Sequence, residues 1–257
     1  MTPQNLADAL VRPRRVLPPD PTPPDHLVKA GDGEVAVFLE GPAEAPLRAL
    51  LVHGWEADHR DLAPLAEALA RRGVFCVLPD LPAHGASTGQ SMTIPEGAAG
   101  VAAVAQLHGP FDLCVGHSMG AAIVLTAIRA GLRPRQTAFM APPLNYVQEL
   151  TKSARAAGAP DPLIDAALAR LEQRCTDLRT IDSTTMAAHL TMPGLVAAAG
   201  NDRVVDPGNG RALAALWSGG RLIEAPEASH RSILHDAAVI AAICDLVTEA
   251  AVAASVQ

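Results

Sequence analysis

Short apolar runs alternate with amphipathic segments along most of the chain. Compact runs rich in Val, Leu and Phe are typical of buried strands, and apolar residues at helical spacing indicate helices with one buried face. These patterns predict strands at 34–40, 47–52, 74–78, 111–115, 136–140, 194–199 and 221–225. They predict helices at 62–72, 98–107, 121–130, about 146–155, 163–174, about 208–216, and from about 234 onward. Strands that alternate with helices indicate the α/β class, with a mostly parallel central sheet and helices on both faces.

Two stretches depart from this alternation. Residues 1–25 contain prolines crowded between Pro13 and Pro24, which favour extended polyproline-like chain and oppose a regular helix, so an N-terminal arm is expected. Residues 142–190 contain helical patterns only, and we interpret them as a small helical lid; the alternative is a surface excursion that packs away from the site. A chain of 257 residues otherwise accommodates one large catalytic domain, placed at 26–257.

The sequence predicts the residues at both ends of the first helix. Asp61 is expected to be the N-cap of the helix at 62–72, and Gly73 stands just past its end. Its apolar positions lie on one face, which predicts that the helix packs against the sheet.

The sequence Gly116-His117-Ser118-Met119-Gly120 joins a predicted strand to a predicted helix. A serine hydroxyl is a weak nucleophile in water, so an enzyme holds it on a rigid turn beside a base and an anion-stabilising site. Two glycines permit the close approach of strand and helix that such a turn needs. Ser118 is therefore the candidate nucleophile, and a plain strand-to-helix turn is the alternative interpretation.

An acidic partner is expected after another strand, because parallel sheets place ligands at the carboxyl ends of their strands. Asp202 follows the predicted strand 194–199 and is the candidate acid. Asp206 competes with it, but Asp206 directly precedes a proline and a predicted helix, where a capping or turn role accounts for it.

The candidate base follows the last predicted strand. His230 lies in the loop there, whereas His235 lies about a turn into the next helix, where an exposed or capping role is favoured. A histidine whose tautomer is fixed by a carboxylate could remove the proton of Ser118, which is the chemistry of a Ser-His-Asp triad.

An anion-stabilising site and a pocket complete the hypothesis. The strand 47–52 runs into a His-Gly turn, which would direct the backbone N–H of Trp55 into the space above Ser118. The N–H of Met119, at the start of a helix, would be the second oxyanion donor. The expected walls of the substrate pocket are Trp55, Tyr146, Leu150 and Met186.

Composition narrows the function classes. The formal net charge of −7 opposes nucleic-acid binding, since phosphate neutralisation needs clustered Lys and Arg. No segment is apolar over the length of about 18 residues that a membrane span needs. No signal peptide is recognised, so a cytoplasmic location is expected. The four cysteines lack the paired C-x-x-C spacing, and two of them fall in predicted strands, so buried reduced thiols are expected. The histidines and cysteines also lack the spacing of metal ligands, so neither a metal nor a cofactor is expected.

Several motifs carry a resemblance to a known family. They are the His-Gly-Trp turn that ends at Trp55, PDLPAHGAS at 79–87, GHSMG at 116–120, GNDRVVD at 200–206 and SHRSILHD at 229–236. In type, order and approximate spacing they resemble the α/β-hydrolase fold superfamily, in its serine-nucleophile, esterase- and lipase-like branch, from about Val28 onward.

The resemblance implies roles for individual residues. The family's chain order of nucleophile, acid and base falls on Ser118, Asp202 and His230. Asp80 and Ser87 are implied to hold their loop through side-chain hydrogen bonds, and Ala83 stands where the family usually has glycine, so a slightly different turn is expected there.

Hydrolysis of a small-molecule carboxylic ester through an acyl-enzyme is the leading hypothesis. The same triad serves thioesters, amides and carbon–carbon bonds, so these substrates stay open. Epoxide hydrolases and haloalkane dehalogenases carry Asp at the elbow, where this chain has Ser118. A ligand receptor on the hydrolase fold and a purely structural interaction module are the alternatives from other classes.

Overall fold

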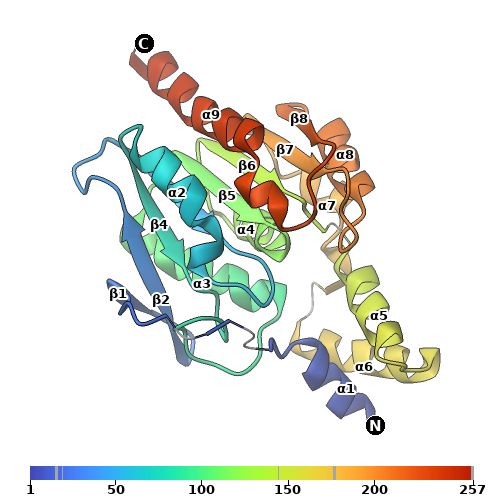
Figure 1. Cartoon of the computed structure of the whole chain (residues 1–257). Helices are drawn as coiled ribbons and strands as arrows, with labels where there is room; N and C mark the ends of the chain where they lie inside the picture. The colour runs from blue at the N-terminus through green and yellow to red at the C-terminus, as the bar shows by residue number, and fades with distance from the viewer. Residues whose placement is uncertain (15–16, 19, 144, 176–177, 256–257) are drawn as a thin grey trace.

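An eight-stranded sheet forms the centre of the molecule (Figure 1). The computed structural model describes residues 1–14, 17–18, 20–143, 145–175 and 178–255. The strands are β1 (His26–Ala30), β2 (Gly33–Glu40), β3 (Leu47–Val52), β4 (Val74–Pro79), β5 (Leu113–His117), β6 (Gln136–Met140), β7 (Gly194–Ala199) and β8 (Gly220–Ala225). Every predicted strand is present within two residues of its expected ends, and β1 is an additional strand that the sequence pattern did not predict.

The strands follow the order β1-β2-β4-β3-β5-β6-β7-β8. β2 pairs antiparallel with β1 and β4, and all other neighbours are parallel, which confirms the mostly parallel sheet. Because parallel strands end at the same edge, the loops that follow β3, β5, β7 and β8 gather there. This carboxyl edge carries every candidate catalytic residue.

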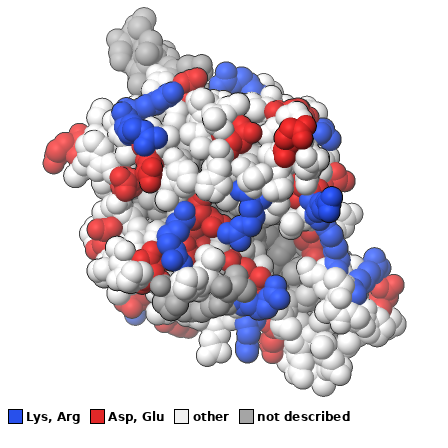
Figure 2. All heavy atoms as spheres, in the orientation of Figure 1, with Lys and Arg blue, Asp and Glu red and all other residues white. Residues whose placement is uncertain are grey.

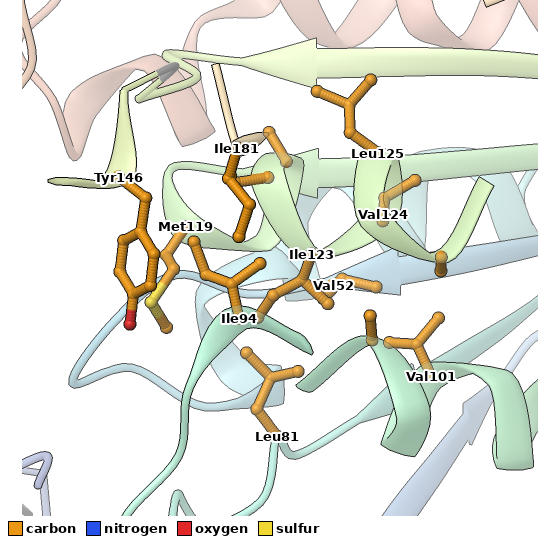
Figure 3. Close-up of a cluster of buried hydrophobic side chains, with 14 of the residues drawn as sticks. Val52, Leu81, Ile94, Val101, Met119, Ile123, Val124, Leu125, Tyr146 and Ile181 are labelled. Atoms are coloured by element: carbon orange, nitrogen blue, oxygen red, sulfur yellow. The ribbon is translucent and has the colours of Figure 1, made fainter. Parts of the chain in front are cut away.

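Helices cover both faces of the sheet, as predicted. α2 (Ala63–Ala70) and α9 (Ala237–Ser255) pack on one face, and α3 (Ile94–His108), α4 (Met119–Arg129) and α8 (Pro207–Leu216) pack on the other. Successive side chains of a strand point to opposite faces of the sheet and join different hydrophobic clusters. In β3, Leu50 belongs to the cluster on the α3–α4 side and Leu51 to the cluster on the α2–α9 side. Figure 3 shows part of the first cluster, in which side chains of α3 and α4 meet Tyr146.

The start of α2 differs from its prediction. A 3₁₀ turn, His59–Leu62, precedes the helix, and the residue at the N-cap is Leu62. The expected cap, Asp61, instead accepts two hydrogen bonds from the Arg231 guanidinium, at 2.7 and 2.8 Å. Asp58 caps the 3₁₀ turn through the Arg60 N–H, so the capping signal lies three residues upstream of its expected place.

The N-terminal segment also needs a correction. It is not extended throughout, because α1 occupies Pro3–Leu10, with the Thr2 side chain as its N-cap. The helix is possible since the crowded prolines begin only at Pro13, and Pro3 stands in the first turn, where proline is tolerated. The division of the chain into an arm at 1–25 and a domain at 26–257 stays a prediction.

The segment expected to be a lid contains α5 (Tyr146–Ala156), α6 (Asp161–Arg174), a 3₁₀ turn at Leu178–Thr180, and α7 (Ser183–Ala187), which was not predicted. In Figure 1, α5 and α6 lie with α1 beside the carboxyl edge of the sheet. All four cysteines are buried, and no disulfide joins them within the described structure.

Charge on the surface is mixed. On the face drawn in Figure 2, basic and acidic side chains are interspersed among uncharged ones, which cover most of the face. Across the residues that the structure describes, no helix has both the length and the apolar character to cross a membrane.

Candidate active site

Ser118 occupies a sharp turn between β5 and α4. Its φ of +52° and ψ of −127° fall in a region that residues with a Cβ rarely adopt. Two glycines permit the turn: a Cβ on Gly116 would lie 2.5 Å from Ala121 Cα, and one on Gly120 would lie 2.2 Å from the Val52 carbonyl oxygen. The turn therefore presents Ser118 at the carboxyl edge of the sheet with the geometry of a nucleophile elbow.

His230 lies between Ser118 and Asp202. The Ser118 hydroxyl donates to His230 Nε2 at 2.8 Å, and His230 Nδ1–H donates to Asp202 Oδ2 at 2.7 Å. The three residues come from the ends of β5, β7 and β8, far apart in sequence. The candidate nucleophile, base and acid are thus joined by one chain of hydrogen bonds.

The competing candidates lie elsewhere. Asp206 caps α8, accepting a hydrogen bond from the Gly208 N–H at 2.8 Å. His235 ends a 3₁₀ turn, Ser232–His235, that precedes α9. The geometry therefore selects Asp202 over Asp206 and His230 over His235 as members of the hydrogen-bonded chain.

The Asp202 carboxylate is held in its charged form. Burial alone would raise its pKa, but hydrogen bonds from His230 and from the backbone N–H groups of Val205 and Val204 outweigh burial and hold the pKa below its usual range. The side chain is 1% exposed, so water screens its charge weakly. Asp202 can accordingly orient the imidazole of His230 and stabilise a positive charge on it.

His117 holds the main chain of His230 through a hydrogen bond, a role that the sequence did not predict. Its Nε2–H donates to the backbone carbonyl oxygen of His230 at 2.8 Å. Burial, and then the nearby His230, lower the pKa of His117 to about 3, so this imidazole is neutral near pH 7. A neutral donor fixes the main chain of His230 without placing a second positive charge beside it.

The turn after β3 packs directly against the elbow. A Cβ on Gly54 would lie 3.0 Å from Ser118 Cβ. His53 Nδ1–H donates to the Gly54 carbonyl oxygen at 2.7 Å, while His53 Nε2 accepts from the Leu81 N–H at 2.9 Å, which ties the turn to the next loop. Neither the Trp55 N–H nor the Met119 N–H donates a hydrogen bond to another described residue.

The loop at 79–87 is held by the side chains that the resemblance implied. The Asp80 carboxylate accepts hydrogen bonds from His59 and from the Ala86 N–H, and these outweigh burial to hold its pKa below the usual range. The Ser87 hydroxyl donates to the Asp80 carbonyl oxygen at 2.6 Å. Ala83, where glycine is usual, has a φ of +66°, the left-handed conformation that explains the glycine preference.

A cavity of about 150 Å³ opens onto Ser118. Its walls are mostly apolar and comprise Leu10, Trp55, Ile94, Met119, Pro143, Tyr146, Glu149, Leu150, Ser153, Val204 and Val205. Three of the expected walls, Trp55, Tyr146 and Leu150, lie there. Met186 does not occur among the described walls, because α7 directs it into the core, where it is fully buried.

Other walls were missed by sequence reasoning. Glu149 and Ser153 share the face of α5 that carries Tyr146 and Leu150, so helical spacing could have identified them. Burial raises the pKa of Glu149, which disfavours its charged form. Leu10 comes from α1, and no pattern in the sequence links that helix to the pocket.

A larger cavity of about 250 Å³ lies between the N-terminal segment and the loops after β3 and β4. Arg14, Glu56 and His84 are among its walls, and Ser118, Asp202 and His230 are not. Of these two cavities, the smaller one is therefore the one that reaches the hydrogen-bonded chain, at Ser118. Over the described part of the chain, no three His, Cys, Asp or Glu side chains gather as metal ligands would.

Comparisons with known proteins agree with this architecture. A family model described as the alpha/beta hydrolase family matches residues 49–243. A search of curated protein sequences finds no match.

Solved structures similar to this chain come from several hydrolases. An enol-lactonase from Burkholderia xenovorans is 21% identical, with 87% of this chain and 100% of that chain covered and a TM-score of 0.69. A thermophilic esterase from Thermogutta terrifontis is 19% identical, with 87% and 98% covered and a TM-score of 0.66. A thioesterase domain from the curacin biosynthetic pathway is 18% identical, with 87% and 98% covered and a TM-score of 0.62. At these identities the likeness is one of fold.

Proposed function

Because the chain belongs to the alpha/beta hydrolase family, we propose that it is a serine esterase that cleaves carboxylic esters of small or medium, largely apolar substrates through an acyl-enzyme. The observation that carries the proposal is the pair of hydrogen bonds that joins Ser118 to His230 and His230 to Asp202, at 2.8 and 2.7 Å. Short, aligned contacts of this kind are what proton transfer from a serine requires.

Acylation is the first half of the reaction. His230 Nε2 removes the hydroxyl proton of Ser118 as Oγ attacks the ester carbonyl carbon, and Asp202 stabilises the resulting imidazolium. The carbonyl oxygen gains the negative charge, and we assign the backbone N–H groups of Trp55 and Met119 as its hydrogen-bond donors. His230 then returns the proton to the departing alcohol oxygen, which leaves an ester on Ser118.

Deacylation reverses these roles with water. His230 takes a proton from a water molecule as its oxygen attacks the acyl carbon of the Ser118 ester. Collapse of the second tetrahedral intermediate breaks the bond to Ser118 Oγ, which recovers its proton from His230. The carboxylic acid is released, and the enzyme returns to its starting state.

The cavity beside Ser118 supports an apolar substrate of modest size. A cavity of about 150 Å³ with apolar walls holds a group about as large as benzene. Tyr146 and Leu150 of α5 form part of these walls, and on that basis we propose that the segment 142–190 is the lid of the site.

Replacement of Ser118 by alanine tests the proposal. Ser118→Ala is expected to lower kcat for p-nitrophenyl butyrate by a factor on the order of 10⁴ or more, with an unchanged thermal midpoint within a few degrees. The matched control is Ser218→Ala, an exposed serine in the turn between α8 and β8, which should keep parental turnover. Parental activity in a clean Ser118→Ala preparation would refute the assignment.

The bond type is tested with matched substrates. Butyryl esters, thioesters and anilides measured side by side should give the highest kcat/KM for the oxygen ester. A higher value for the thioester or the anilide would replace the esterase proposal by a thioesterase or an amidase on the same residues. An organophosphonate should label Ser118 in either case, since it reacts with the activated serine rather than with a particular substrate bond.

A further inference from the structure

We propose that the N-terminal segment is a wall of the substrate pocket and that Leu10 sets the length of the acyl group that the pocket admits. The inference rests on the proposed function, because it assigns the cavity beside Ser118 to the acyl group. It adds a specificity-determining residue that lies outside the stretch matched by the family, residues 49–243.

The position of Leu10 is the first observation. Leu10 is the last residue of α1, and it lines the same cavity as Ser118, with Ile94 and Tyr146 among the other walls. Figure 3 shows Tyr146, Met119 and Ile94 lying together where α5, α4 and α3 approach one another. A larger side chain at position 10 would therefore occupy part of the cavity, and a smaller one would enlarge it.

The helix that carries Leu10 is packed firmly into the molecule. Leu6 and Ala7 are each 2% exposed, and Val11, directly after the helix, is fully buried. These residues belong to the same hydrophobic cluster as Leu150 of α5 and Leu168 of α6, and Figure 1 shows α1 alongside α6. Burial of such side chains gives α1 a fixed place against α5 and α6.

Hydrogen bonds with two further residues, Met92 and Glu56, also hold the segment. The Met92 N–H donates to the Val11 carbonyl oxygen at 2.7 Å. The Arg14 guanidinium forms a two-point contact with the Glu56 carboxylate, at 2.8 and 3.0 Å, and the Arg14 N–H donates to the same carboxylate at 3.0 Å. Glu56 directly follows Trp55, so the segment is tied to the turn that carries a proposed oxyanion donor.

Chain-length profiles test the wall. The probes are p-nitrophenyl esters from acetate to decanoate, assayed with the parent, Leu10→Ala and Leu10→Phe. Each methylene group that gains burial is worth roughly four-fold in kcat/KM. Shortening the side chain in Leu10→Ala should therefore raise the octanoate-to-butyrate ratio by on the order of ten-fold, and Leu10→Phe should lower the ratio and favour acetate.

A matched control lies on the same helix. Asp8 is exposed, and its carboxylate accepts a hydrogen bond only from Gln4 one turn earlier among the contacts described, so Asp8→Ala should keep the parental profile. Thermal midpoints of all variants separate a changed wall from a displaced helix, because a displaced helix would lower the midpoint and alter kcat for every ester. Identical chain-length profiles for the parent and both Leu10 variants would overturn the proposal.

A second readout distinguishes this inference from the proposed function. Alkyl phosphonates of graded chain length label the serine whichever acyl bond the protein cleaves, and their labelling rates should follow the same order in the Leu10 variants. If the parent reacts with phosphonates but Leu10 variants leave the chain-length order unchanged, the wall alone is refuted. If the parent neither hydrolyses esters nor reacts with phosphonates, both proposals are refuted.

Discussion

Replacing Gly120 by alanine would push a methyl group into the backbone of the neighbouring strand. An ideal Cβ at position 120 lies 2.2 Å from the Val52 carbonyl oxygen and 2.4 Å from the His53 carbonyl oxygen. Carbon and carbonyl oxygen ordinarily approach to about 3.3 Å. The start of α4 must therefore move away from the end of β3 by about 1 Å, because backbone carbonyls cannot rotate aside as a flexible side chain could.

Both stability and activity should respond. Overpacking of a close-packed interior costs about 1–3 kcal/mol, and a rigid backbone contact favours the upper end of that range, about 3 kcal/mol of unfolding free energy. The same displacement separates Ser118 from the turn that carries Trp55. A misplacement of about 1 Å in a catalytic arrangement costs on the order of 100-fold in turnover.

Urea unfolding followed by circular dichroism and ester hydrolysis measure the two effects. Gly210→Ala is the control, since Gly210 is also a helical glycine, but its Cβ would meet only side-chain atoms, at 3.2 Å from Val196 Cγ1 and 3.6 Å from Pro142 Cδ. We expect that control to stay within about 1 kcal/mol of the parent, because alanine gains helix propensity and the contacts can adjust. A Gly120→Ala variant with the parental urea midpoint and parental turnover would refute the reasoning.

Two further predictions concern the buried carboxylates. Asp202→Asn should lower kcat by on the order of 10⁴ and leave the fold intact, because the amide stabilises the wrong tautomer of His230. The control Asp206→Asn alters only the cap of α8 and should keep turnover near the parental value. Equal kcat values for the two variants would contradict the choice of Asp202 as the acid. Acid should destabilise the protein: Asp80 and Asp202 have lowered pKa values in the folded state, so their stabilisation is present above the ordinary carboxylate pKa and disappears as pH falls through the folded values. Urea midpoints that stay constant from pH 6 down to pH 3 would contradict this second prediction.

The regular part of the fold was predictable because the physical signals are local. Buried parallel strands give compact apolar runs, and β6 (Gln136–Met140) and β7 (Gly194–Ala199) match their predicted ends. The edge strand β1 lacks such a run, because four of its five residues are exposed or half-buried. Its strand conformation therefore depends on pairing with β2 rather than on an apolar pattern in its own sequence. α1 was missed for a related reason, since its burial depends on α5 and α6.

The site residues, too, were predictable where their signal is local and were missed where it depends on contacts between distant segments. Ser118, Asp202 and His230 each follow a predicted strand, so the parallel topology itself predicts their proximity. The role of His117 could not be read in this way, because its contact is to the backbone of His230, more than a hundred residues away. Leu10 lines the pocket but was not predicted, whereas Met186 was predicted to line it but is buried in the core. Whether a helix directs a side chain into a cavity or into the core depends on packing between distant segments.

The location of the proposed base in the sheet has a consequence for how activity would be lost on heating. His230 follows β8, the strand at one border of the sheet, whose residues are mostly exposed or half-buried, whereas Ser118 follows β5 in the fully buried centre. Border elements open with less free energy than the centre does, in partial unfolding events that leave most of the structure in place. A brief detachment of β8 would carry His230 away from Ser118 while the central strands stay paired. We therefore expect heat inactivation to begin at this border of the sheet. Stabilising the contacts between β8 and β7 should then lengthen the half-life of activity at high temperature more than further packing of the centre would.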